Sequence, residues 1–394
     1  MIDISKYKEF SVIGAGTMGR EIAQVAIMSD QFESVKLWSR TQKTLDIASN
    51  FIETGIKKLE TKGLLGEKSA KSTLEKLIIE RDFEKASKAD YIVESVPEFM
   101  DLKQSTFKKL GNLAPEHTIL ATNTSTMSIT EIASSSGRPE KVVGMHFFTP
   151  IPVLELIELI RGKETSDETF EIGAAIGESL PYIGGKKFVA RIEKESPGFI
   201  VNRLTIASGA YIDWLTDVAM EKGIPWKDLN EDLAVPNQMG GLAKRDYLGL
   251  DVIRNAAKYF EEKVSPDFAT GKALAKLIDD GYLGRKTGKG FLEWSEDGKP
   301  ITDGAKKANI GNMDCFMALQ MNEGCRLLEE GIVSSYETID KTMIAGMRSR
   351  GPFELGKDRY KEWCDLLDDF AKKSGKKYFS PTKLMQTGDF LKYK

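Results

Sequence analysis

The sequence has little histidine or cysteine and no long apolar run. Its three cysteines, Cys315, Cys325 and Cys364, include no CxxC pair and have no histidine near them, which excludes a disulfide framework and argues against a zinc site. No run approaches the ~18 consecutive apolar residues of a membrane span, and the N-terminus lacks the apolar core of a signal peptide. We therefore expect a cytoplasmic protein with no metal ion and no membrane partner.

Neither sign of charge dominates, because 56 Lys and Arg residues stand against 59 Asp and Glu residues, for a net charge of -3. No nucleic-acid partner is expected, since this balance implies no basic surface. The 394 residues are 41% hydrophobic and 29% charged, which is typical of a soluble globular protein of two or three domains. Only His117 and His146 offer an imidazole for chemistry near neutral pH.

Short β-branched runs alternate with helical patterns over roughly the first 190 residues, which predicts βαβ units and a largely parallel sheet. The expected strands are residues 10–13, 35–38, 91–93, 118–122, 142–146 and 154–160. One helix is expected over residues 52–63, where Gly63 ends it, and another follows Ser128, whose spacing to Glu131 is that of a helix cap.

The pattern changes at Ser196 and Pro197, which have the residue types of a helix cap and a first helical position. From there the patterns are helical almost throughout. Residues 213–241 and 320–352 loosely repeat each other, because each is a helix ending in acidic residues and glycine, followed by an Asp-bearing stretch and a methionine-glycine turn. We expect an α/β Rossmann-type domain over residues 1–192, an all-α domain over 193–298 and a second, diverged helical module over 299–394.

Gly14, Gly16 and Gly19 form a GxGxxG pattern between a predicted strand and a predicted helix. The first glycine allows a tight turn, the second lets a pyrophosphate approach the backbone, and the third lets helix and strand pack closely. The helix N-terminus adds amide donors and partial positive charge. Residues 14–19, including Thr17 and Met18, are therefore expected to bind a dinucleotide; a turn that serves packing alone is the alternative.

Five further motifs follow the glycine loop in order. They are "ADYIVESVPEFMDLKQ", "ILATNTSTMSITEIA", "VVGMHFFTPIPVLELIELI", "SPGFIVNRL" and "DDGYLGRKTGKGFLEW". Together with the glycine loop, this series resembles the 3-hydroxyacyl-CoA dehydrogenase family over about residues 8 to 295. The resemblance implies an (S)-3-hydroxyacyl-CoA dehydrogenase of fatty acid β-oxidation type, which transfers hydride between a nicotinamide dinucleotide and C3 of an acyl-CoA substrate.

His146 ends a predicted strand, where open α/β sheets place their ligands, and Glu158 lies on the next predicted strand. A carboxylate on one ring nitrogen fixes the tautomer and leaves the other nitrogen as a base. The resemblance implies that His146 is the general acid/base and Glu158 its partner, with Ser125 and Asn202 holding the reacting oxygen. Residue type alone favours the alternatives, in which Ser125 belongs to a turn and Asn202 is a polar helix residue whose hydrogen bonds are made within the protein. His117 precedes a strand at the opposite end, which indicates a surface residue.

The resemblance also implies cofactor contacts at Glu98, Lys103 and Asn123 and CoA contacts at Lys58, Lys62 and Ser125. Lys58 and Lys62 are four residues apart and are expected on one helix face, where a solvated charged surface is the alternative. For Glu98 and Lys103 the alternative is a solvated helix start. Thr149 stands where the family usually has asparagine.

Ser39 follows the second predicted strand, where NAD-dependent members of the family usually have an aspartate that accepts the ribose hydroxyls. Serine cannot repel a 2′-phosphate, and Arg40 could bind one; alternatively, Arg40 stacks on the adenine or faces solvent. The family implies NAD, and Ser39 with Arg40 leaves NADP open.

The leading hypothesis is therefore a 3-hydroxyacyl-CoA dehydrogenase without an enoyl-CoA hydratase module. A dehydrogenase of a free hydroxy acid or sugar acid on the same fold is one alternative, and a non-catalytic nucleotide-binding or structural protein is another. The family implies a homodimer through the helical part, although the second helical module offers similar packing within one chain.

Overall fold

The computed structural model describes residues 2–234 and 239–394 and divides into two compact units. The first unit runs to Phe199 and includes the short segments Gly331–Val333 and Lys341–Ser349, and the second unit contains the rest. The domain boundary predicted at residue 192 stays a prediction. The predicted further division at residue 298 stays a prediction.

The first unit is built on one large sheet of described residues with the strand order β10-β7-β6-β5-β4-β1-β2-β3. All neighbouring strands pair in parallel except β6 and β7, which are antiparallel. The predicted, largely parallel sheet is therefore confirmed. Its strands are β1 (Glu9–Ile13), β2 (Ser34–Trp38), β3 (Leu77–Glu80), β4 (Tyr91–Glu94), β5 (Ile119–Thr122), β6 (Val142–Phe147), β7 (Leu156–Ile160) and β10 (Phe188–Ile192).

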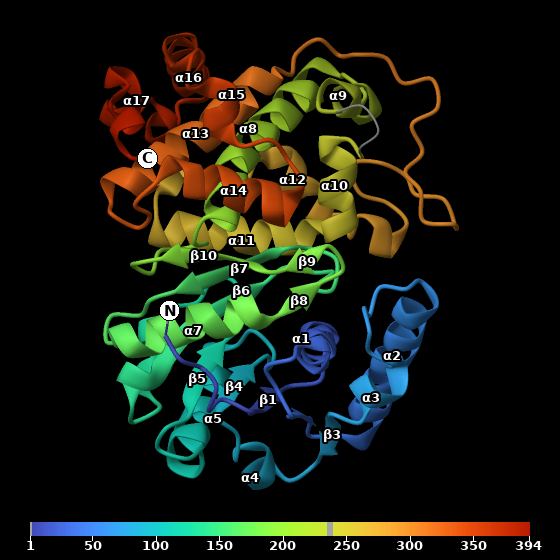
Figure 1. Ribbon diagram of the computed structural model, residues 1–394. Coiled ribbons are helices and arrows are strands. Elements are labelled where there is room, and N and C mark those ends of the chain that lie inside the picture. Colours follow the sequence, from blue (N-terminus) through green and yellow to red (C-terminus); the bar gives the residue numbers. More distant parts are fainter. Residues whose placement is uncertain (1, 235–238) are drawn as a thin grey trace. The chain divides into compact units, whose positions relative to one another are not determined.

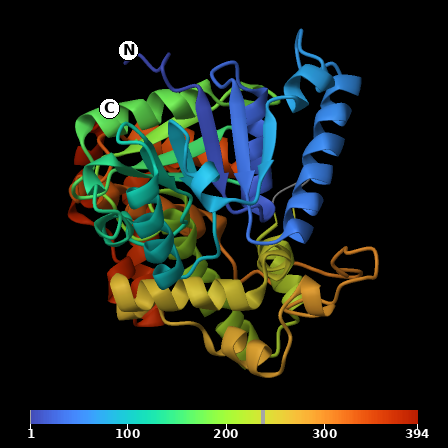
Figure 2. The same ribbon diagram turned by 90° about the horizontal axis from the view of Figure 1, so that it is seen from below.

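Helices cover the sheet, which is why the central strands β4, β5 and β6 are buried along their whole length. Helix α1 packs on β1 and β2, and α7 packs on β6, β7 and β10; Figures 1 and 2 show these layers from two sides. The helices and the small β8–β9 hairpin of this unit are α1 (Thr17–Met28), α2 (Gln42–Thr61), α3 (Ala70–Leu74), α4 (Phe83–Ala86), α5 (Met100–Leu113), α6 (Ile129–Ser134), η1 (Pro139–Lys141), α7 (Asp167–Ser179), β8 (Pro181–Tyr182) and β9 (Gly185–Lys186).

The predicted helix start at Ser196 and Pro197 is wrong. Helix α8 begins at Val201, because Gly198 (φ 74°) and Phe199 (φ 54°) have left-handed backbone conformations that cannot continue a right-handed helix. The backbone N–H of Phe199 instead donates to the carbonyl of Ser196 (3.0 Å), so this segment forms a turn. The cap at Ser128 is confirmed, since its hydroxyl accepts from the backbone N–H of Glu131.

The described part of the second unit is helical, as predicted. Helix α8 packs against α12 and α13, and α13 packs against α15 and α16. Its helices are α8 (Val201–Lys222), α9 (Trp226–Asp232), α10 (Gly241–Leu248), α11 (Leu250–Lys263), η2 (Pro266–Phe268), α12 (Lys272–Asp279), η3 (Arg285–Thr287), α13 (Met313–Glu329), α14 (Tyr336–Met347, up to Asp340 in this unit), α15 (Pro352–Gly356), α16 (Tyr360–Ser374), η4 (Lys377–Phe379), α17 (Lys383–Thr387) and η5 (Asp389–Lys392).

Asp246 organises the glycine-rich motif of residues 279–294. Its buried carboxylate accepts two backbone N–H bonds (2.9 and 2.8 Å) and the indole N–H of Trp294 (3.1 Å). A Cβ at Gly284 or Gly290 would lie 2.2 or 2.1 Å from atoms of Asp246, so both positions require glycine. Burial raises the pKa of Asp246. This motif therefore has a packing role around one carboxylate.

In both segments of the predicted repeat, a polar side chain accepts backbone N–H groups at the N-terminus of the following helix. Asn230 accepts one backbone N–H bond from α10 (3.0 Å), whereas Asp340 accepts two from α15 (2.9 and 2.7 Å). A Cβ at Gly240 would lie 2.4 Å from Asn230, and one at Gly351 would lie 2.2 Å from Asp340. Burial raises the pKa of Asp340 to about 6. This likeness supports the repeat, whose Gln238 lies outside the described residues.

Candidate active site

The glycine loop lies between β1 and α1, and its three glycines differ in what they allow. A Cβ at Gly14 would lie 2.4 Å from the carbonyl oxygen of Ser95, and one at Gly19 would lie 1.7 Å from that of Gly14. A Cβ at Gly16 would meet nothing within 4 Å. Packing thus requires glycine at 14 and 19, whereas position 16 faces open space that fits a ligand close to the backbone.

The N-terminus of α1 suits an anion. Gly16 is the N-cap residue, no side chain caps the helix, and its first turn contains no acidic residue. The backbone N–H groups of that turn therefore point to where a pyrophosphate would bind. Thr17 and Met18 lie in this turn, as predicted from the sequence, and their contact with the cofactor stays a prediction.

His146 and Glu158 lie directly opposite each other on the antiparallel strands β6 and β7. The Nδ1 atom of His146 is 2.8 Å from Oε2 of Glu158. His146 is 6% exposed, and Glu158 is fully buried. An ionised carboxylate is only an acceptor, so Nδ1 has the proton and Nε2 is the nitrogen that can exchange one with a substrate.

Two aromatic rings pack on the imidazole of His146. The ring centroid of Phe148 lies 4.4 Å from that of His146, and the centroid of Phe199 lies 5.8 Å away. Phe199 is buried and has a left-handed backbone, which is rare for a bulky residue and indicates a conformation that the surrounding structure enforces. No sequence pattern indicated this contact, because Phe199 lies far from His146 along the chain.

Lys103 is enclosed by two carboxylates. Its Nζ atom lies 2.9 Å from Oε1 of Glu94 and 3.1 Å from Oε2 of Glu98, and its side chain is 1% exposed. Burial raises the pKa of Glu94, and the charge of Lys103 opposes this rise. Sequence reasoning identified Glu98 and Lys103 but missed Glu94, whose only signal is an acidic residue at the end of an apolar strand.

Glu98 also links the start of α5 to the loop after β5. Its Oε1 atom accepts the backbone N–H of Ser125 (3.0 Å) and the hydroxyl of Thr124. The amide of Asn123 accepts from the backbone N–H of Phe147 (2.9 Å) and so joins the ends of β5 and β6. Predicted cofactor and substrate residues therefore lie together at the carboxyl ends of β4, β5 and β6.

Two carboxylates that the sequence patterns did not indicate, those of Glu21 and Glu195, hold the neighbouring loops in place. Buried Glu21 accepts the hydroxyl of Thr149 (3.0 Å) and the backbone N–H of Ile151 (2.7 Å). Glu195 accepts from the backbone N–H of Thr130 (3.0 Å) at the start of α6. Thr149, which departs from the family pattern, thus connects the loop after His146 to α1.

Lys187 holds the same loop from another side. Its ammonium donates to the carbonyl groups of Ile151 and Leu154. Burial lowers the pKa of Lys187 to about 7, against the opposing charges of Glu155 and Glu21.

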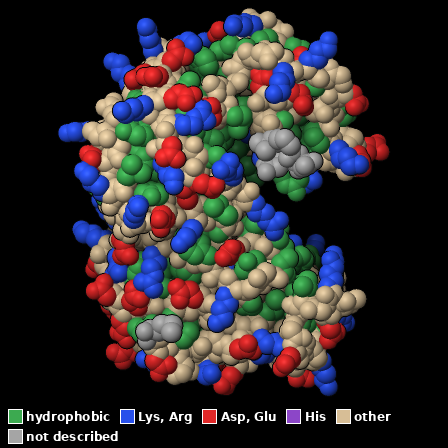
Figure 3. All heavy atoms as spheres, turned by 45° about the horizontal axis from the view of Figure 1, so that its top comes forward, with side chains coloured by type: hydrophobic (Ala, Val, Ile, Leu, Met, Phe, Trp, Pro, Cys, Tyr) green, Lys and Arg blue, Asp and Glu red, His purple; other side chains and the backbone are tan. Residues whose placement is uncertain are grey.

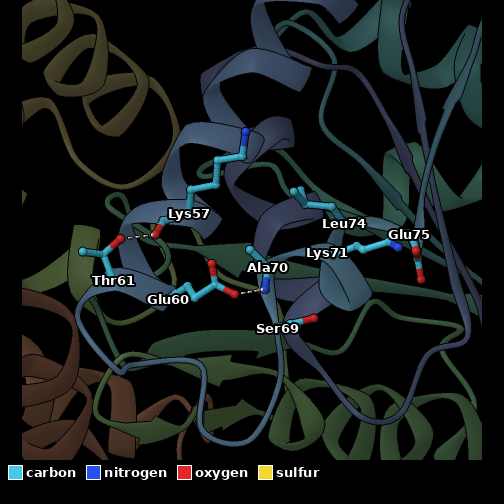
Figure 4. Close-up of a pocket in the computed structure, with 8 residues that line it drawn as sticks. All are labelled: Lys57, Glu60, Thr61, Ser69, Ala70, Lys71, Leu74 and Glu75. Carbon is cyan, nitrogen blue, oxygen red and sulfur yellow. Dashed lines mark hydrogen bonds between the residues drawn. The ribbon is translucent and has the colours of Figure 1, made fainter.

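Lys58 and Lys62 are both exposed at the end of α2. Lys58 lies in the last turn, whereas Lys62 is the C-cap residue, so the predicted helix ends just before it. A groove of about 760 Å³ lies beside these residues, between α2 and α3 (Figure 4). Neither lysine lines it; the lining residues are Lys57, Glu60, Thr61, Ser69, Ala70, Lys71, Leu74 and Glu75. That Lys58 and Lys62 bind CoA stays a prediction.

Three further sequence predictions concern separate places. Asn202 lies in the first turn of α8, in the second unit. Ser39 is half-buried after β2, followed by exposed Arg40. His117 is a surface residue, as predicted: its Nε2 atom lies 2.8 Å from Oδ1 of Asp90, and its side chain is 51% exposed.

Among the described residues, no cluster of His, Cys, Asp or Glu could hold a metal ion. The cysteines, all three within the described ranges, are free thiols. None of the helices that the structure describes is long and apolar enough to cross a membrane. Figure 3 shows Lys and Arg side chains interspersed with Asp and Glu over the face drawn.

Two family models together match more than two thirds of the chain. The model described as "3-hydroxyacyl-CoA dehydrogenase, NAD binding domain" matches residues 9–190. The model described as "3-hydroxyacyl-CoA dehydrogenase, C-terminal domain" matches residues 198–294. A 3-hydroxybutyryl-CoA dehydrogenase from Clostridioides difficile is 37% identical over 294 residues, which is 73% of this chain and 100% of that protein.

Solved structures extend the comparison. An (S)-3-hydroxybutyryl-CoA dehydrogenase from Ralstonia eutropha has a TM-score of 0.67 at 28% identity and covers 74% of this chain and 100% of its own. A 3-hydroxybutyryl-CoA dehydrogenase from Escherichia coli K12 has a TM-score of 0.81 at 24% identity and covers 98% of this chain and 99% of its own. The latter shows that the fold of the added C-terminal helices also occurs in another protein.

Proposed function

The chain belongs to the 3-hydroxyacyl-CoA dehydrogenase family, and we propose that His146 and Glu158 are the acid–base pair with which it catalyses that family's reaction. The chain is an oxidoreductase with an NAD-binding Rossmann-type domain. Its reaction is reversible hydride transfer at C3 of a 3-hydroxyacyl-CoA. The observation that supports the pair is the 2.8 Å contact between a nearly buried imidazole and a fully buried carboxylate at the end of β6.

The residues of the glycine loop fit the cofactor, because position 16 and the first turn of α1 leave backbone N–H groups open to a pyrophosphate. When bound, NAD accepts the hydride from C3 in the direction of oxidation. In that direction Nε2 of His146 takes the proton of the 3-hydroxyl, and Glu158 stabilises the imidazolium that forms. In reduction the imidazolium returns the proton to the oxygen.

Ser125 and Asn202 are proposed to hold the reacting oxygen. Neutral donors suit an oxygen that is a hydroxyl in one state and a carbonyl in the other. The backbone of Ser125 is fixed by Glu98, which Lys103 holds in turn. This chain of contacts supports a role for Glu98 and Lys103 in positioning Ser125, beside the cofactor contacts proposed for them and for Asn123.

Lys58 and Lys62 are proposed to bind the phosphates of CoA, because both are exposed cations near the same helix end. The alternative is a role at the helix C-terminus, where cations are favourable without any ligand. A cytoplasmic location and a homodimer through the helical part are also proposals, and neither depends on the catalytic pair.

Acetoacetyl-CoA and free acetoacetate distinguish the acyl-CoA substrate from a free acid. We expect NADH oxidation with acetoacetyl-CoA and much less with acetoacetate at the same concentration. Lys58→Ala with Lys62→Ala should raise KM for acetoacetyl-CoA, whereas the exposed control Lys85→Ala should not. Equal turnover of both substrates, unaffected by the lysine variants, would favour a free hydroxy acid instead.

A further inference from the structure

We propose that the turn after β2 is a binding site for the 2′-phosphate of NADP, formed by Arg40 and Arg81, so that the enzyme accepts NADP as well as NAD. This inference rests on the proposed function only in taking the bound molecule to be a nicotinamide dinucleotide. Arg40 and Ser39 are visible in the sequence pattern, whereas Arg81 enters the site through the fold alone.

The end of β2 lies directly beside the glycine loop. The backbone N–H of Gly14 donates to the carbonyl of Trp38 (2.9 Å), the last residue of β2. Ser39 and Arg40 are the two residues after Trp38, so they lie close to the glycine loop that fits the pyrophosphate. In a βαβ dinucleotide fold this turn lies at the adenosine ribose, whose 2′-oxygen distinguishes NADP from NAD.

The strand β3 brings Arg81 to the same turn. Glu80 pairs with Trp38 across β2 and β3, and the indole N–H of Trp38 donates to the carbonyl of Arg81 (3.1 Å). The Nη2 atom of Arg81 then donates to the carbonyl of Arg40 (3.1 Å). Two guanidinium side chains, both exposed, are thus attached to one turn.

The neighbouring carboxylates are engaged with backbone groups. Glu80 accepts the backbone N–H groups of Arg81 and Asp82 (2.8 Å each), and Asp82 accepts that of Glu84 (2.8 Å) at the start of α4. In the described part of the chain, no carboxylate forms a salt bridge with Arg40 or Arg81. Both guanidinium groups are therefore available to an anion from solution.

This arrangement fits a phosphate dianion better than a ribose hydroxyl pair. A carboxylate after β2 would accept both ribose hydroxyls and repel a 2′-phosphate. The neutral hydroxyl of Ser39 binds the ribose hydroxyls more weakly and does not repel a phosphate. Guanidinium groups bind phosphate through charge-assisted, often bidentate hydrogen bonds. The hydroxyl of Ser39 can still bond one ribose oxygen, so NAD remains a cofactor.

Isothermal titration calorimetry of the full chain with adenosine 2′,5′-bisphosphate tests the site without requiring turnover. The comparison ligand is ADP, which has both phosphates on the 5′ oxygen. We expect the 2′,5′-bisphosphate to bind about tenfold more tightly, or better, because hydrogen bonds to charged groups give effects of this order. Arg40→Ala and Arg81→Ala should each remove most of that preference, and the exposed control Arg350→Ala should leave it intact.

Ser39→Asp keeps both arginines and tests the site by repulsion. It should abolish the preference for the 2′,5′-bisphosphate, because the new carboxylate repels the 2′-phosphate and accepts the free ribose hydroxyls of ADP. The ratio of kcat/KM for NADPH to that for NADH should fall with it. If Arg81→Ala fails to fold, Arg40→Ala and Ser39→Asp still decide the question. Equal affinity of the wild type for the two ligands, or a preference that survives these variants, overturns the proposal. Absence of turnover with acetoacetyl-CoA would instead contradict the proposed function and leave the nucleotide result standing.

Discussion

The chain has two histidines, and each forms a contact of 2.8 Å with a carboxylate. His146 and Glu158 join β6 to β7. His117 lies just before the first residue of β5, and Asp90 just before the first residue of β4, so this pair is at the amino ends of these parallel strands. The pairs differ in burial. The side chain of His146 is 8% exposed and that of Glu158 fully buried, against 51% for His117 and 18% for Asp90.

The comparison shows that two histidine–carboxylate contacts of equal length can lie in very different surroundings, so the distance alone does not support the acid–base role proposed for His146. Asp90 uses one oxygen for the backbone N–H groups of Lys8 and Glu9 (2.7 and 2.8 Å) and so fixes the start of β1. His146 instead lies near the carboxyl end of β6, with Nδ1 engaged and two aromatic rings against it. Location and burial distinguish the two pairs, while the contact distance does not.

Removing the imidazole of the buried pair should have the largest effect. His146→Gln is expected to lower kcat for acetoacetyl-CoA reduction about 10²- to 10⁴-fold, which is the usual contribution of a general acid or base. Steady-state NADH oxidation measures this, and calorimetry with ADP provides the folding control. Ordinary turnover by a folded His146→Gln variant would disprove the mechanism.

Glu158→Gln removes the partner and keeps the imidazole. We expect kcat to fall roughly a hundredfold, less than for loss of His146, because an amide neither fixes the tautomer nor stabilises the imidazolium. The same assay measures it, with KM for NADH as the control that should stay constant. A variant as active as the wild type would make Glu158 a structural residue.

Phe148→Leu makes the surroundings of His146 more like those of His117. The ring of Phe148 is half-buried and packs on the imidazole at 4.4 Å between centroids, so its loss should loosen the position of Nε2. We expect kcat to fall about three- to tenfold, since orientation of a catalytic group affects the rate steeply. Tyr360→Leu, at an aromatic contact with Phe390 among the C-terminal helices, is the control and should leave kcat unchanged.

Asp90→Asn should lower stability and leave activity intact. Burial opposes ionisation of Asp90, but the hydrogen bonds from Glu9, His117 and Lys8 outweigh it and lower its pKa. A carboxylate with a lowered pKa stabilises the folded state above its unfolded pKa of 3.8, and this contribution is lost as the pH falls through the lower folded pKa. Urea unfolding should show a loss of about 1–2 kcal/mol at pH 7 that shrinks toward pH 3.

His117→Asn should have the smallest effect. The pair is half-exposed, and exposed ion pairs contribute about 0–1 kcal/mol. We expect kcat equal to that of the wild type and a change in the free energy of unfolding within about 1 kcal/mol at pH 7. A large drop in kcat here would remove the distinction between the two pairs.

The residues that sequence reasoning identified correctly share one property: their signals are local or periodic. Alternation of apolar runs predicted the sheet, and the place of Glu158 on the next predicted strand indicated that it can return to His146. Ser128 as a cap needed only the spacing to Glu131. The family membership confirmed the reaction class that these motifs implied.

The features that sequence reasoning missed depend on contacts between distant segments. Ser196 and Pro197 have the local signature of a helix start, but Phe199 packs on His146 in a left-handed conformation and delays the helix to Val201. Glu94 is buried because Lys103 reaches it from the next helix. Arg81 joins the turn at Arg40 only because β3 pairs with β2. In each of these three cases, no pattern within one segment of the sequence predicts the contact with the other segment.

Gly16 separates what the fold requires from what the ligand requires. Its backbone (φ -68°, ψ -167°) is accessible to any residue, and a Cβ there would meet no heavy atom within 4 Å. In terms of mutational tolerance, protein atoms exclude a Cβ at positions 14 and 19, whereas at position 16 only a bound molecule would exclude one. We therefore expect Gly14→Ala and Gly19→Ala to lower the stability of the fold, and Gly16→Ala to weaken dinucleotide binding while the protein stays folded.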